Sequence, residues 1–164
     1  MSLYFVLSAG LVLSVLLSAL ILGTLVWNYR LWSHHAPEEM AEFIPPLNDR
    51  EKVHRYWVAL VFFILMFGVP IAGIKLFQAK TGGSLGYWEL FLFLWGVWMT
   101  FNIVDLMILD WLIVVKLWPQ VFYPPEVNHL LHLNSYKFHF IAFCKGTVGL
   151  TVASFPFAGL FLFL

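Results

Sequence analysis

The fold is decided by residues 90–117, which read LFLFLWGVWMTFNIVDLMILDWLIVVKL. An α-helix needs only about 20 apolar residues to cross a hydrocarbon core of about 30 Å, and this run is longer. We therefore predict a tilted transmembrane helix from Tyr87 to Trp118. Its interior nevertheless carries three polar residues, Asn102, Asp105 and Asp110.

These three side chains occupy one side of the expected helix. At about 100° per residue they spread over a sector about 140° wide. A carboxylate near the centre of a bilayer costs a few kcal/mol even on the lenient insertion scale, so the sector is expected to face protein or water rather than lipid. Two interpretations remain open: a functional site, or buried ion-pair and capping partners that only hold helices together.

The composition is that of an integral membrane protein. Of the 164 residues, 62% are hydrophobic and 11% are charged, whereas about a quarter are charged in soluble domains. The net charge is zero and no basic block is present, so no nucleic-acid partner is expected. One cysteine, Cys144, excludes an intrachain disulfide and Cys-x-x-Cys chemistry.

The apolar segments predict an all-α fold, a polytopic four-transmembrane-helix bundle that forms a single membrane domain over residues 1–164. The expected helices cover about 2–27, 56–77, 87–118 and 138–164, with a polar loop at 28–55 and an interfacial loop at 119–137.

Smaller features refine this bundle. Gly10, Ser14 and Ser18 recur every four residues and predict a close packing seam between helices. Pro37, followed by two glutamates, predicts a helix start within the first loop. Pro124 and Pro125 predict a short interfacial helix in the second loop.

Charge distribution predicts the orientation. The first and third connections carry more basic residues than the second, which has only Lys75 and Lys80 nearby. By the positive-inside rule, loops 28–55 and 119–137 are cytoplasmic and both termini are extracytoplasmic.

A depth comparison suggests a partner for one aspartate. Counted at 1.5 Å per residue from the cytoplasmic face, Asp110 and Lys145 lie at about 12 and 9 Å, so an ion pair between them is geometrically feasible. Asp105 lies deeper and has no obvious cation. Two explanations are open for it: Asn102 or Thr100 hydrogen-bonds it, or its carboxyl is protonated, because desolvation raises a carboxyl pKa. We therefore predict an intramembrane polar network of Asn102, Asp105, Asp110 and Lys145, in which Asp105 is the better functional candidate.

All six histidines lie in or beside the two expected cytoplasmic connections. Histidine binds metal or haem and acts as a general base. No H-E-x-x-H motif is present, and solvated surface is the simpler interpretation, so the sequence identifies no cofactor. The candidates are His34, His35, His54, His129, His132 and His139, together with Glu38 and Glu39.

Two segments of the C-terminal half carry a resemblance. FNIVDLMILDWL at 101–112, followed by YKFHFIAFCKG at 136–146, resembles a pattern in small bacterial four-helix integral membrane proteins that have no assigned activity. The resemblance implies a bacterial inner-membrane location and no functional residues.

Three functions follow from these features. The first is a small non-enzymatic membrane protein, an assembly subunit or a module that binds lipids or a partner, including a second copy of itself. The second is an oligomeric proton- or ion-conducting protein that uses Asp105. The third is an interfacial enzyme that acts on a lipid or quinone through histidine-bound metal or haem.

Overall fold

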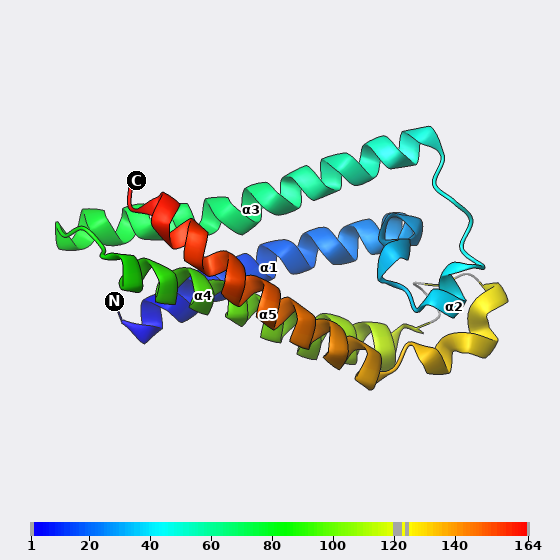
Figure 1. Cartoon of the computed structure of the whole chain (residues 1–164). Helices are drawn as coiled ribbons and strands as arrows, with labels where there is room; N and C mark the ends of the chain where they lie inside the picture. The colour runs from blue at the N-terminus through cyan, green and yellow to red at the C-terminus, as the bar shows by residue number, and fades with distance from the viewer. Residues whose placement is uncertain (1, 120–122, 124, 164) are drawn as a thin grey trace.

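The computed structural model describes residues 2–119, 123 and 125–163, and within these ranges all regular structure is helical (Figure 1). Four helices are long and apolar enough to cross a membrane: Leu3–Trp27, Asp49–Thr81, Tyr87–Leu117 and Tyr136–Phe161. They correspond to α1, α3, α4 continued by η2, and α5. The predicted all-α class with four such helices is therefore confirmed.

The helix α4 (Tyr87–Val104) is the centre of the bundle. It packs against α1 on one side and α5 on the other, while α3 packs mainly against α1. The side chains of Phe93, Leu94 and Val97 are fully buried on it. Trp98 is buried as well, and its indole N–H donates a 2.9 Å hydrogen bond to the carbonyl of Met66 in α3. These contacts fix three helices around α4.

The small-residue seam of α1 lies against α4, as its spacing predicts. A Cβ atom added at Gly10 would lie 2.5 Å from the Cβ of Thr100, closer than real Cβ contacts allow. Ser14, one turn later, is buried and donates its hydroxyl to the carbonyl of Gly10 at 2.7 Å. The glycine therefore allows the two backbones to approach closely.

The chain ends and the α3–α4 turn lie at one end of the bundle, and the other two connections lie at the opposite end (Figure 1). The second end holds the short helices η1 (Tyr29–His35), α2 (Glu38–Ala41) and η4 (Pro125–Leu133). The helix α2 begins directly after Pro37, as predicted. Pro124 and Leu164, which were expected to begin and end helices, lie outside the described residues.

The helix α3 begins at Asp49, seven residues before the expected start at 56. A capping box explains this start, because Asn48 Oδ1 accepts from the Glu51 N–H at 2.9 Å and Glu51 Oε2 accepts from the Asn48 N–H at 2.8 Å. Arg30 forms a 2.9 Å ion pair with Glu51 and thereby ties η1 to α3. The apolar pattern missed the first two turns because they are polar.

The predicted continuous α-helix over 87–118 is instead two kinds of helix. Residues Asp105–Leu117 form a π-helix, η2, which ends with the N–H of Trp118 bonded to the carbonyl of Ile113 at 2.9 Å, five residues back. Residues five apart are about 140° apart on an α-helix, but only about 50° apart when each hydrogen bond spans five residues. The wider winding therefore brings Asp105 and Asp110 to the same side.

Candidate functional site

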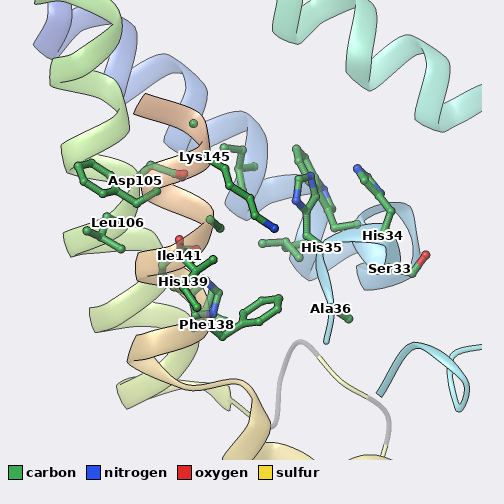
Figure 2. A pocket seen from close by; sticks show the side chains of 18 of the residues that line it. Ser33, His34, His35, Ala36, Asp105, Leu106, Phe138, His139, Ile141 and Lys145 are labelled. Carbon is green, nitrogen blue, oxygen red and sulfur yellow. Dashed lines mark ion pairs between the residues drawn. The ribbon is translucent and has the colours of Figure 1, made fainter. Parts of the chain in front are cut away.

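A half-open cavity of about 660 Å³ lies at the end of the bundle that holds η1. Its walls come from α1, η1, α3, the α4–η2 unit and α5, and Figure 2 shows labelled side chains from several of these elements around it. The volume is in the range of about 300–1,000 Å³ that is typical of small-molecule pockets. Most of the wall is apolar, and polar side chains converge from η1, η2 and α5.

All four residues of the predicted polar network line this cavity: Asn102, Asp105, Asp110 and Lys145. The cavity thus collects side chains from α4, η2 and α5 in one place.

The side chain that contacts Asp110 is His139, whose Nδ1 lies 3.1 Å from Asp110 Oδ2. The depth comparison favoured Lys145 because it assumed an α-helical rise through 105–117 and a last helix that began near 138. In the structure the segment is π-helical and α5 begins at Tyr136. Among the described residues, Lys145 makes no ion pair.

His139 is held from both sides. Its Nε2 lies 2.7 Å from Asn134 Oδ1, and both residues are buried. Asn134 Nδ2 is buried and has no hydrogen-bond partner among the residues that the structure describes, so within them the amide engages His139 through one atom. The imidazole therefore connects the turn before α5 to η2 and fixes the orientation of Asp110.

Asn102 hydrogen-bonds residues of α5 and does not hydrogen-bond Asp105. Its Nδ2 donates to Thr147 Oγ1 at 3.0 Å and to the Phe143 carbonyl at 3.4 Å. Gly146 permits this approach, because a Cβ there would lie 3.0 Å from Asn102 Oδ1.

Asp105 has neither of the partners expected for it. Thr100 donates to the carbonyl of Gly96 at 2.8 Å. No described residue makes a hydrogen bond or ion pair with the Asp105 carboxylate. Among the two acidic side chains that line the cavity, Asp105 is therefore the one without a partner in the described chain.

The six histidines separate into two groups. His34, His35 and His139 line the cavity (Figure 2). The others lie elsewhere: His54 packs on Trp27 with ring centroids 5.1 Å apart, His129 lies against Phe43 at 5.8 Å, and His132 Nδ1 contacts the His129 carbonyl at 3.2 Å. Within the described ranges, no three His, Cys, Asp or Glu side chains are placed to hold a metal ion.

The pKa values of both η1 histidines are lowered, which favours their neutral forms at pH 7. Desolvation in the hollow, with help from His35 and Arg55, lowers the pKa of His34 to about 4. Desolvation also lowers the pKa of His35, although Asp110 opposes the shift. The two ring centroids are 4.1 Å apart, which is why His35 contributes to the shift of His34.

The sequence did not indicate that η1 would form a cavity wall. Tyr29, Trp32 and Ser33 all line it. The Trp32 indole N–H donates to Thr24 Oγ1 at 2.9 Å, which holds η1 against the end of α1. Tyr29 and Trp32 are aromatic residues of the kind found at a membrane–water interface, and their presence in the sequence does not by itself predict a pocket.

Comparisons with protein-family models, with curated proteins and with solved structures find no match to the chain. The class that the fold defines is an all-helical protein with four helices able to cross a membrane.

Proposed function

We propose that this chain is a non-enzymatic integral membrane protein whose cavity binds an amphipathic ligand taken from the surrounding lipid. The observation that carries the proposal is the cavity itself. It combines a predominantly apolar wall with a few convergent polar side chains, the usual composition of a ligand site. The exposed Leu, Ile, Val and Phe side chains outside it suit contact with hydrocarbon.

The proposed membrane is a bacterial inner membrane, with both termini extracytoplasmic. Supporting this orientation, the two connections with the basic excess share one end of the bundle and the termini share the other (Figure 1). Reporter fusions at the C-terminus test it: a reporter active only outside the cytoplasm should be active, and a fluorescent cytoplasmic reporter should be dark.

The binding proposal is tested by native mass spectrometry of the protein purified from its own membrane. The wild-type chain should retain a bound small molecule of lipid mass. Ala142→Phe places a ring on the cavity wall and should lower the occupancy. Ala72→Phe makes the same change at an exposed site on α3 and is the matched control. A wild-type chain without bound ligand, or equal occupancy in both variants, would refute the proposal.

A second candidate function is a proton-conducting oligomer, and it is supported by the titratable groups that lie together in the cavity. Asp105, the Asp110–His139 pair and His35 line one cavity. Such a series could relay protons between His35 and Asp105. In proteoliposomes, Asp105→Asn should abolish proton flux, and an unchanged flux in that variant would eliminate this candidate.

A further inference from the structure

Two opposite charges in the cavity have no partner within the described chain. Lys145 reaches from α5 toward His35, and Asp105 lies on η2 at the other side of the site (Figure 2). They do not form an ion pair with each other or with any other described residue. Asp110, by contrast, is matched by His139 at 3.1 Å. Asp105 is partly buried, and an unmatched acidic group beside an apolar wall is unfavourable, whereas Lys145 is exposed and available to a ligand. A ligand that engaged both side chains would remove the cost at Asp105.

The charge of the cavity restricts what the ligand can be. The histidines of η1 add no positive charge at neutral pH, since desolvation lowers the pKa of both. Asp110 already has a partner in His139, so Lys145 and Asp105 remain as the basic and acidic side chains of the cavity that no described residue engages. A purely anionic ligand would match Lys145 but leave Asp105 unmatched, and a purely cationic ligand would do the reverse.

We infer that the cavity recognises a zwitterion, with its acidic group on Lys145 and its ammonium group on Asp105. This inference rests on the proposed binding function and specifies its ligand class. The apolar wall, which includes Phe101, Leu106 and Ile141, seats the hydrocarbon part. A phospholipid with a phosphate and a primary ammonium in its headgroup has this chemistry, and so does free phosphoethanolamine.

Lipid binding by native mass spectrometry tests the inference. The protein, stripped of its own lipid in detergent, is titrated with phosphatidylethanolamine and with phosphatidylglycerol of the same acyl chains. The wild-type chain should prefer phosphatidylethanolamine. Asp105→Asn should reduce that preference by about tenfold, as expected for losing one charge-assisted hydrogen bond. Asp105→Glu keeps the charge and should retain the preference.

Lys145→Met should weaken the binding of both lipids by about tenfold or more, because both headgroups contain the phosphate. The matched controls are Lys80→Met and Glu39→Gln, which change exposed residues outside the cavity wall and should bind like the wild type. Tryptophan-fluorescence melting verifies that each variant is folded before titration.

The outcomes separate the inference from the proposed function. Binding of both lipids with equal affinity, or an Asp105→Asn variant with an unchanged preference, would overturn the inference that the ligand is a zwitterion. The proposal that the cavity binds lipid would then still stand. Absence of any binding by the wild type would overturn both. Binding of free phosphoethanolamine with the same dependence on Asp105 and Lys145 would support the zwitterion and assign it a soluble source.

Discussion

Replacing Gly10 by alanine should destabilise the bundle, because the added methyl group has no space. Its Cβ would lie 2.5 Å from Thr100 Cβ and 2.8 Å from both Cγ2 and Oγ1 of Thr100. Overpacking of this kind costs about 1–3 kcal/mol. Alanine also favours the helix by up to about 1 kcal/mol over glycine, which complicates a single measurement.

The matched control is Gly23→Ala in the same helix, where a Cβ would meet nothing within 4 Å. Both variants gain the same helix propensity, so the difference between them isolates the steric cost. We expect the unfolding free energy of Gly10→Ala to be about 1–3 kcal/mol below that of Gly23→Ala.

The assay is equilibrium unfolding in mixed detergent micelles, followed by the fluorescence of the eight tryptophans. Adding Thr100→Gly should restore much of the stability that Gly10→Ala loses, since it removes all three clashing atoms, and the coupling in the double-mutant cycle should be at least about 1 kcal/mol. Equal stability of the two alanine variants, or a coupling near zero, would refute the close packing of α1 on α4.

Three further predictions concern the cavity. His139→Leu should lower the unfolding free energy by about 1.5–3 kcal/mol, because it removes the charged hydrogen bond to Asp110, and combining it with Asp110→Asn should give less than the sum of the two losses. Independent losses that add fully in calorimetry would count against the pair. The thermal stability should fall as the pH drops from about 6.5 to about 4, since in this window the unfolded chain protonates His34 while the fold, with its pKa of about 4, keeps the ring neutral. A fluorescence melt of His34→Gln should show a smaller fall than His54→Gln, and identical pH profiles would contradict the assignment. Asp105→Asn should raise the melting temperature of the ligand-free protein, because it removes an unmatched carboxylate; a lower melting temperature would mean that the charge is stabilised within the chain.

Hydropathy alone predicted four helices and their order, because twenty or more apolar residues in a row leave a chain few alternatives. It located their ends less well. The α3 start depends on a hydrogen-bonded capping box between Asn48 and Glu51, and such a box is polar and invisible to a hydropathy pattern. The packing seam at Gly10 was predictable, because small residues spaced four apart allow another helix to approach closely at that position.

The site was predicted in part. The sequence drew attention to Asp105, Asp110 and Lys145 because charge in an apolar run is conspicuous, and all three line the cavity. Partners were not predictable in the same way. The pairing of Asp110 with His139 depends on a π-helical segment and on a turn near Asn134, and neither leaves a periodicity that distinguishes it from an ordinary α-helix.

The π-helical winding of η2 also bears on hydrophobic mismatch. As a uniform α-helix, the 31 residues Tyr87–Leu117 would extend about 46 Å, well beyond a hydrocarbon core of about 30 Å. Each turn of η2 holds more residues than an α-helical turn, so the same chain covers less distance along its axis. In the proposed membrane, this shortening absorbs part of the surplus length that tilting would otherwise have to absorb.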